Sequence, residues 1–227
     1  MKQMKISVII CAKNEEKTIG EVIQKSKPFA DEIIVVDGHS KDKTREIARS
    51  LGAKVILDHG KGKGEAIRCG IKEAKGDILV FLDADGSHNP EDIPKLIEPI
   101  QKGEADHVTG SRMLGGSDEA HGDLYKFIRM WGSDIITLGI NYRFNVRLTD
   151  SQNGFRAIRR DVARALNLKE NITTIEQEMV IKTLKKGYRM AEVPAHEYAR
   201  KYGTSSIKLR KVMFRYVYSW LKYLFFD

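Results

Sequence analysis

The first half of the chain alternates between short apolar runs and stretches whose apolar residues recur at helical spacing. The apolar runs cover residues 5–11, 31–37, 54–57 and 77–82. Runs that are apolar on both faces predict buried strands, and the helical stretches between them predict right-handed βαβ units. The pattern indicates an α/β fold with a mostly parallel central sheet flanked by helices.

The alternation loosens in the second half of the chain but does not end. We expect further strands at 106–111, 156–158 and 189–193, and helices at 90–102, 125–141, 161–166 and 174–186. A loop is expected at 115–119, where glycines and acidic residues follow one another. We therefore divide the chain into one domain at 1–206 and a C-terminal helix at 207–227.

That C-terminal stretch combines apolar, aromatic and basic residues at helical spacing. Its apolar positions include Trp220 and Leu224, and Lys208, Arg210 and Lys211 lie among them. Such a pattern predicts an amphipathic helix that lies on an anionic membrane surface. A helix docked on its own domain, or on a second subunit of a homo-oligomer, would show the same pattern.

Composition is that of a soluble globular protein. Of 227 residues, 41% are hydrophobic and 31% are charged. No run approaches the roughly 18 to 20 apolar residues of a membrane span, and the amino end lacks the apolar region of a signal peptide. We expect a cytoplasmic protein, held peripherally at the cytoplasmic face of the membrane. Cys11 and Cys69 offer neither a disulfide framework nor a zinc spacing.

The chain is basic, with a formal net charge of +8 and a pI near 9.3. This charge favours an anionic partner such as nucleic acid, an anionic membrane or a phosphorylated substrate. The sequence has no helix-turn-helix, zinc or aromatic-strand signature of nucleic-acid binding. A membrane surface and a phosphorylated ligand are therefore the expected partners.

Two carboxylates follow the fourth apolar run, where Asp83 and Asp85 flank Ala84. Ligands of open α/β sheets bind at the carboxyl ends of the strands. On a continuing strand both carboxylates would face the same side, and their repulsion calls for a cation between them. Hard oxygen ligands favour Mg²⁺ or Mn²⁺. A polar turn that caps the helix beginning near Pro90 is the alternative interpretation.

Four loops follow the predicted parallel strands and should meet at one edge of the sheet. They cover residues 12–15, 37–42, 60–64 and 83–88. Their carboxylates, asparagine and Gly/Lys segment together suit the base, sugar and pyrophosphate of a nucleotide with its metal. The Gly/Lys segment lacks the order of a P-loop or a dinucleotide fingerprint, so a mobile turn explains it as well as phosphate contact.

The combination of motifs is more specific than any one of them. The segments that carry it are 8–15, 35–44, 62–66, 76–77 and 83–85. In order and spacing they resemble the family 2 glycosyltransferases of the GT-A fold. Later segments, at 150–156, 176–179, 192–194 and 200–205, resemble the branch that contains the dolichyl-phosphate mannose and glucose synthases.

This resemblance implies roles for individual residues. It places Ala12, Asn14, Glu15 and Asp37 at the base and ribose of a nucleotide sugar, with Gly64, Asp83 and Ala84 also at the donor. Asp83 and Asp85 would bridge the pyrophosphate through Mg²⁺ or Mn²⁺. Ser87 stands where mannose synthases usually have a glutamine, and it would take over that metal contact. Arg200, Ser205 and Lys208 would meet the phosphates or the acceptor.

The chemistry depends on the acceptor. A lipid phosphate is already anionic, because its second pKa is about 6, and needs little help from a base. An alcohol acceptor would need one, and Glu178 and Asp150 are the candidates, followed by Glu176. Glutamates on a lysine-rich helix also form solvated pairs at helical spacing. The resemblance implies inversion at the anomeric carbon.

The resemblance therefore implies an inverting, metal-dependent enzyme that moves mannose or glucose from a GDP- or UDP-linked donor to a polyprenyl phosphate. Gly62, Lys63 and Gly64, together with Gly86, look closer to the glucose-transferring branch, which uses UDP. Two alternatives stay open. One is a transferase acting on a glycan or soluble hydroxyl, and the other is a non-catalytic module that binds nucleotide sugars.

Overall fold

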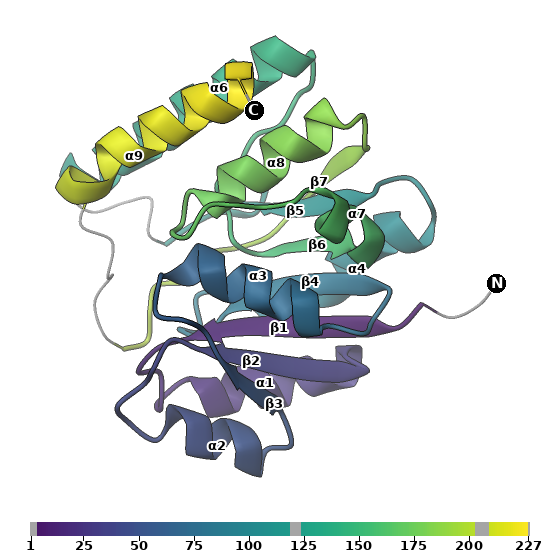
Figure 1. Ribbon diagram of the computed structural model, residues 1–227, viewed down its shortest axis with the longest axis vertical. Helices are drawn as coiled ribbons and strands as arrows, with labels where there is room; N and C mark the ends of the chain where they lie inside the picture. Colours follow the sequence, from purple (N-terminus) through teal and green to yellow (C-terminus); the bar gives the residue numbers. More distant parts are fainter. Residues whose placement is uncertain (1–3, 119–123, 203–208, 227) are drawn as a thin grey trace.

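The computed structural model describes residues 4–118, 124–202 and 209–226. A single sheet of seven strands runs through it, in the order β3-β2-β1-β4-β6-β5-β7. Strand β6 is antiparallel to both of its neighbours, and the other neighbouring strands are parallel. The prediction of an α/β fold with a mostly parallel sheet and flanking helices is confirmed (Figure 1).

The strands lie close to the predicted apolar runs. They are β1 Ile6–Ala12, β2 Glu32–Asp37, β3 Lys54–Leu57, β4 Ile78–Asp83, β5 His107–Ser111, β6 Arg156–Arg159 and β7 Met190–Pro194. The helices are α1 Ile19–Ser26, α2 Thr44–Ser50, α3 Lys63–Glu73, α4 Ile93–Gln101, α5 Arg112–Gly115, α6 Leu124–Phe144, α7 Arg160–Ala165, α8 Ile175–Lys185 and α9 Leu209–Leu221.

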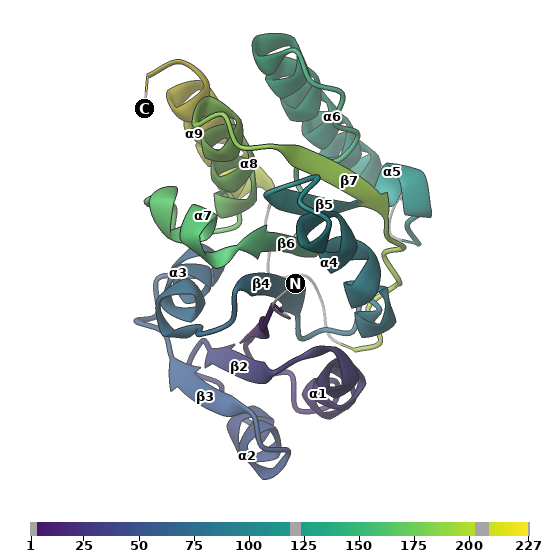
Figure 2. The same cartoon turned by 90° about the vertical axis from the view of Figure 1, so that its right-hand side faces the viewer.

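Alternate residues of the central strands enter two different cores. Val8 and Ile10 pack with α1, α2 and α4 on one face, whereas Ile9 packs with α3, α7 and α8 on the other. Figure 2 shows these helix layers on opposite sides of the sheet. Burial on both faces explains why the strands read as continuous apolar runs rather than alternating ones.

A third, smaller core lies where α6, α8 and the C-terminal segment meet. It contains Ile140 of α6, Val180 of α8 and the buried Tyr223 and Leu224, which follow α9 in a π-helical segment, Lys222–Phe226. Helices α6 and α9 are neighbours at one end of the molecule (Figure 1), and Gly139 of α6 faces the indole ring of Trp220. One face of the C-terminal segment is therefore docked on the domain.

The four helices expected between residues 90 and 186 agree with the observed ones to within three residues at either end. The sequence also predicts a helix that opens at Asn14, but α1 begins at Ile19, because residues 13–18 form bends and a turn. The short helix α5 precedes the expected loop at 115–119 and was not predicted. None of the helices within the described ranges is long and apolar enough to cross a membrane.

Candidate active site

The carboxyl ends of the central strands share one edge of the sheet. In the strand register Ala12 stands beside Asp37, and Cys11 stands beside Asp83. Strand β3 ends level with β2, since Leu57 pairs with Asp37. The loops after β1, β2, β3 and β4 therefore begin at the same edge, as predicted.

The loops after β1 and β2 hold each other through Asn14. The main-chain N–H of Asn14 donates to the Ser40 hydroxyl over 2.8 Å, and the Asn14 side-chain oxygen accepts from the N–H of Lys41 over 2.8 Å. Asn14 has a φ of 57°, a left-handed conformation that asparagine tolerates. The N–H of Glu15 donates to the Thr44 hydroxyl over 2.8 Å. These bonds fix Asn14 and Glu15 beside the strand ends.

Asp37 ends β2 with a fully buried carboxylate. Its Oδ1 accepts from the N–H of Ser40 over 2.9 Å and lies 3.6 Å from the Arg45 guanidinium. Its Oδ2 is buried and has no hydrogen-bond partner within the described part of the chain. Buried polar atoms are normally satisfied, so this oxygen is an acceptor that a ligand hydroxyl or N–H group could use.

Asp83 ends β4 and is paired with Lys63, the first residue of α3. The Lys63 ammonium nitrogen lies 2.8 Å from Oδ1 of Asp83, 2.9 Å from its Oδ2 and 3.0 Å from Oε1 of Glu176. Burial opposes the charge on Lys63, but the two carboxylates outweigh it and raise the pKa of the ammonium group. Burial alone would raise the pKa of Asp83, but the neighbouring Lys63 ammonium group outweighs burial and lowers it.

Gly64 and Gly154 permit close packing around this cluster. The N–H of Gly64 donates to the carbonyl oxygen of Asn171 over 2.8 Å, and a β-carbon at Gly64 would lie 2.6 Å from two carbonyl oxygens of the same segment. The N–H of Gly64, expected at the donor, is thus used within the protein. A β-carbon at Gly154 would lie 2.8 Å from the Lys63 ammonium nitrogen.

Asp85 is buried and is paired with Arg200. Its Oδ2 lies 2.8 Å from the guanidinium nitrogen Nη2, and its Oδ1 accepts from the N–H and hydroxyl of Ser87 over 3.0 and 2.6 Å. Glu15 is close enough that its pKa is raised, by burial first and then by the charges of Asp85 and Asp83. The sequence predicted that Glu15, Asp85, Ser87 and Arg200 lie at the same site, and the structure brings these four side chains together.

His88 follows this turn and is buried against Phe155, with the two rings stacked at 5.2 Å between centroids. Its Nε2 lies 3.1 Å from the side-chain oxygen of Asn153, and its Nδ1 is buried without a partner in the described residues. Asn153 in turn donates to the carbonyl oxygen of Gly110 over 2.7 Å. The turn after β4 is thus tied to the segment that precedes β6.

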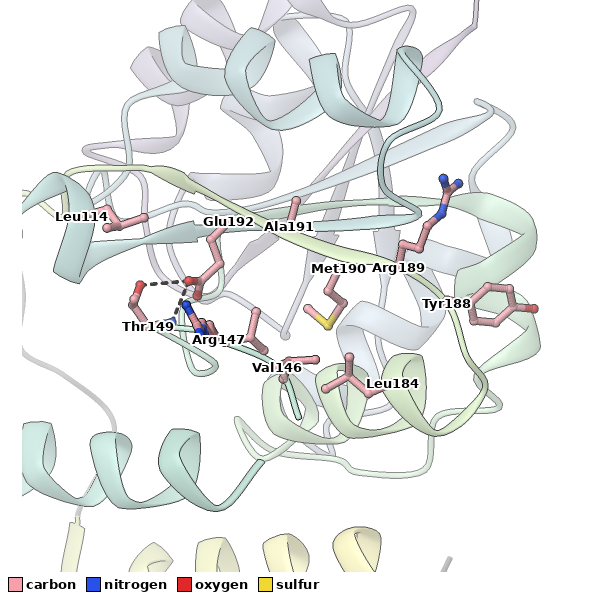
Figure 3. Close-up of a pocket in the computed structure, with 11 residues that line it drawn as sticks. Leu114, Val146, Arg147, Thr149, Leu184, Tyr188, Arg189, Met190, Ala191 and Glu192 are labelled. Atoms are coloured by element: carbon pink, nitrogen blue, oxygen red, sulfur yellow. Dashed lines mark hydrogen bonds between the residues drawn. The ribbon is translucent and has the colours of Figure 1, made fainter. Parts of the chain in front are cut away.

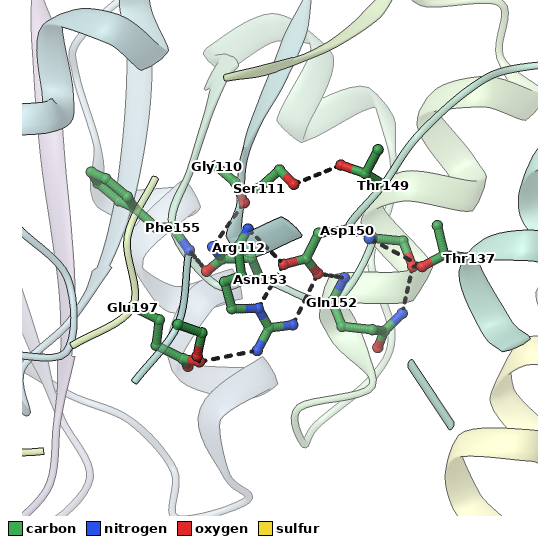
Figure 4. Close-up of polar contacts among 12 residues, drawn as sticks. Gly110, Ser111, Arg112, Thr137, Thr149, Asp150, Gln152, Asn153, Phe155 and Glu197 are labelled. Atoms are coloured by element: carbon green, nitrogen blue, oxygen red, sulfur yellow. Dashed lines mark hydrogen bonds and ion pairs between the residues drawn. The ribbon is translucent and has the colours of Figure 1, made fainter. Parts of the chain in front are cut away.

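Asp150 faces Arg112 (Figure 4). Asp83 and Asp85, which we call the acidic pair, are instead bound by Lys63 and Arg200. Arg112 donates to the two carboxylate oxygens of Asp150 over 2.6 and 2.9 Å, and also lies 3.6 Å from Glu197. Burial would raise the pKa of Asp150, but the guanidinium and its hydrogen bonds outweigh burial and lower it. A carboxylate held in this way is a poor proton acceptor.

Glu178, the other expected base, lies apart from the acidic pair. It is fully buried, accepts from the main-chain N–H groups of Lys169 and Glu170, and lies 2.8 Å from the Lys182 ammonium nitrogen. Its neighbour on the same helix, Glu176, contacts Lys63 instead. The carboxylate that α8 brings to the site is therefore Glu176.

Some site residues escaped sequence reasoning, and others lie beyond what the structure describes. Lys63 and Arg112 hold the acidic groups in place, yet no pattern in the sequence paired either of them with an acidic partner. Only the short Gly-Lys-Gly segment marked Lys63. Ser205 and Lys208 lie outside the described residues.

The oxygen donors of Asp83, Asp85 and Ser87 fit Mg²⁺ or Mn²⁺ in their chemistry. Each carboxylate already pairs with a basic side chain, however. Among the described residues, the one group of three His, Cys, Asp or Glu ligand atoms within 4.8 Å lies elsewhere, at His59, Glu65 and Cys69. The acidic pair therefore fits a divalent ion that brings further oxygen ligands with it, as a diphosphate would.

A cavity of about 640 Å³ lies away from this edge, along the outer side of β7 (Figure 3). Leu114, Val146, Leu184 and Met190 contribute apolar walls. Glu192 also lines it and accepts from the N–H groups of Thr149 and Asp150 over 2.6 and 2.8 Å. The cavity contains none of the residues at the carboxyl ends of β1, β2 and β4, so it is not the nucleotide site.

The family model for glycosyl transferase family 2 matches residues 7–166. The chain belongs to this family. This glycosyltransferase is 34% identical to a dolichol-phosphate mannosyltransferase of Pyrococcus furiosus, over 97% of the chain and 64% of that protein. It is 32% identical to a UDP-N-acetylglucosamine–dolichyl-phosphate N-acetylglucosaminyltransferase of Methanococcus voltae, over 92% and 94%.

A solved structure shows the same fold around a bound nucleotide. The glucosyl-3-phosphoglycerate synthase of Mycobacterium tuberculosis, in complex with Mn²⁺, UDP and its product, superposes with a TM-score of 0.77 at 25% identity. The match covers 97% of this glycosyltransferase and 80% of the other chain. The predicted family and the GT-A type of fold are therefore confirmed.

Proposed function

We propose that this glycosyltransferase moves a hexose from a nucleotide sugar to a polyprenyl phosphate. The single observation that carries the proposal is the double charge cluster at the sheet edge, in which Lys63 joins Asp83 to Glu176 and Arg200 joins Asp85. Relatives named for dolichyl-phosphate sugar transfer support the acceptor. A UDP complex of a similar fold supports the donor.

In this proposal the loops after β1 and β2 bind the base and ribose. Asp37 offers a buried unsatisfied oxygen, and Asn14 and Glu15 are fixed beside it through Ser40 and Thr44. Ala12 and Ala84 are buried in the core at the ends of β1 and β4, and their main chain would lie beside the ligand. Either a GDP- or a UDP-linked hexose is compatible with these contacts.

Asp83, Asp85 and Ser87 would hold Mg²⁺ or Mn²⁺ against the diphosphate, and the ion would neutralise charge on the leaving group. Arg200 is placed to turn from Asp85 to phosphate oxygens, for which its planar fork is suited. Positive groups aimed at a developing anion are each worth about 10²- to 10³-fold in rate. Ser205 and Lys208 are proposed to meet the phosphates from the same side.

The acceptor phosphate oxygen would attack the anomeric carbon as the bond to the nucleoside diphosphate breaks, which inverts the configuration. An ionised phosphate needs no side-chain base. This agrees with the structure, because Asp150 is neutralised by Arg112 and Glu178 is sequestered by Lys182 and main-chain N–H groups. Asp150 and Glu178 then organise the site rather than move protons.

Membrane attachment is part of the proposal. Helices α6 and α9, with the segment after α9, expose large apolar side chains, which we call the apolar patch. Its members are Trp131, Ile135, Leu138, Tyr142, Met213, Phe214, Val217, Tyr218, Leu221, Phe225 and Phe226. Tyr142 is 91% exposed and Phe214 is 78% exposed. Exposed apolar patches of this kind mark membrane or protein contacts, and a lipid acceptor favours the membrane.

The test is a screen of radiolabelled UDP- and GDP-hexoses with a polyprenyl phosphate and Mn²⁺, followed by extraction. With the wild-type enzyme we expect label in the organic phase. With Asp85→Ala we expect none there. Label that stays aqueous with a phosphorylated hydroxyl acceptor would instead favour a soluble acceptor, as in the glucosyl-3-phosphoglycerate synthase. Binding of a donor without turnover on any acceptor would contradict the enzyme.

A further inference from the structure

Lys63 occupies the space between two carboxylates, one of which, Asp83, is a proposed metal ligand. It lies within 3.0 Å of oxygens of both Asp83 and Glu176, which come from β4 and α8. Its side chain is largely buried, and the ammonium group lies where a side chain at Gly154 would stand, since a β-carbon there would lie 2.8 Å from the ammonium nitrogen. The position of Lys63 is thus built into the fold.

The charges around Lys63 decide which cation the site accepts. Asp83, Glu176 and Asp85 carry three negative charges, and Lys63 and Arg200 carry two positive ones. The free site therefore has a net charge of −1 from these five groups. Binding of a divalent ion alone would bring this net charge to +1. The space is partly buried, so the excess positive charge would be poorly screened. A divalent ion with a nucleoside diphosphate, which brings two or more negative charges, leaves no such excess.

We propose that Lys63 is a built-in counter-ion that keeps a divalent ion out of the acidic site until a nucleoside diphosphate arrives with it. The inference rests on the proposed function and adds an order of binding to it. Lys63 stabilises Asp83 and Glu176 in the free enzyme, as buried carboxylates require. When the metal and diphosphate bind together, the phosphates become an alternative partner for its ammonium group.

The experiment measures Mn²⁺ binding by electron paramagnetic resonance, in which the signal of free Mn²⁺ falls as the ion binds. Wild-type protein is titrated with Mn²⁺ alone and with Mn²⁺ plus UDP or GDP. The same titrations are made on Lys63→Met and on Lys61→Met. Lys61 is the matched control, because it is exposed in the same loop and its removal changes the net charge equally.

Wild type and Lys61→Met should bind Mn²⁺ at least about tenfold more weakly without the nucleotide than with it. Lys63→Met should bind Mn²⁺ alone at least about tenfold more tightly than wild type, because one ammonium charge facing the ion is gone. Equal affinity of wild type with and without nucleotide overturns the inference, and so does an unchanged affinity in Lys63→Met. The wild-type comparison can still overturn the inference if Lys63→Met fails to fold.

Failure of the proposed function would look different. The proposed function fails if the extraction assay detects no sugar transfer, or detects transfer that needs no divalent ion. The Mn²⁺ titration of the free protein needs no acceptor and no turnover. Lys63→Arg, which retains the charge, should keep the weak Mn²⁺ binding of wild type, whereas a purely structural role for Lys63 would leave Mn²⁺ affinity equal in all variants.

Discussion

Gly154 faces the ammonium group of Lys63 so closely that a β-carbon at Gly154 would lie 2.8 Å from it, and 3.3 Å from Oδ2 of Asp83. The backbone of the segment before β6 is thus one wall of the charge cluster. A chain segment that looks like a polar turn in the sequence sets the position of a lysine more than 90 residues earlier.

Gly154→Ala should therefore reduce transfer activity by at least about tenfold, because Lys63 or Asp83 must shift to admit the methyl group. The fold should survive, since the substitution adds one methyl at the rim of the cluster. Initial rates and a thermal melt measure the two effects separately. Gly132→Ala is the control: it lies within α6 with no neighbour within 4 Å, and it should stabilise the helix by about 0.5–1 kcal/mol at unchanged activity.

Arg112 should matter more for stability than an ordinary surface arginine. Asp150 is almost fully buried, and Arg112 neutralises it with two hydrogen bonds. Arg112→Ala leaves that charge unpaired and should lower the free energy of unfolding by about 3–5 kcal/mol. Chemical denaturation measures this loss. Lys102→Ala, which removes an exposed lysine from the exposed Glu98, should cost less than about 1 kcal/mol. Equal losses in the two variants would contradict the assignment.

The sequence predicted most of the fold because the central strands are buried on both faces. Ile78–Asp83 reads as one apolar run for that reason, and the register of β1, β2 and β4 then brings Asp37, Asp83 and Asp85 to one edge. The direction of β6 could not be predicted, since a short strand of four residues looks the same in either orientation.

The partners of the acidic residues were harder to predict than the acidic residues themselves. Strand ends identify Asp83, but its pairing with Lys63 depends on how α3 sits against β4 and α8. The same is true of α8, where Glu176 and Glu178 look equivalent in the sequence and point to different surroundings. Tertiary packing, not local pattern, decides which carboxylate enters the site.

Acid should destabilise the protein partly through Glu65. Hydrogen bonds from His59 and Cys69 outweigh the effect of burial and lower its pKa from 4.5 to about 2. A carboxylate with a depressed folded-state pKa stabilises the fold above its unfolded pKa, and that stabilisation is lost as pH falls from 4.5 to about 2. The loss amounts to up to about 3 kcal/mol, from about 1.4 kcal/mol for each unit of pKa.

Unfolding free energies at pH 5 and pH 2.5 measure this loss in wild type and in Glu65→Gln. The glutamine variant should be less stable at pH 5 and should lose less on acidification. Glu73→Gln is the control, because Glu73 is on the same helix but exposed, and its pairing with Lys54 should contribute little. An identical pH dependence in wild type and Glu65→Gln would contradict the assignment.

The apolar patch should decide whether the enzyme reaches the proposed lipid acceptor. Leu138 of α6 and Phe214 of α9 are both mostly exposed, and neither belongs to the core shared with α8. Replacing both with glutamate should abolish flotation with anionic liposomes, because two charges would have to enter the membrane interface. Leu57→Glu, at a half-exposed apolar position on β3, should float like wild type. Donor hydrolysis should be unchanged in both variants, whereas transfer to liposome-bound polyprenyl phosphate should fall at least about tenfold only in the double variant. Equal flotation of all three proteins would show that the patch serves another contact, such as a second subunit.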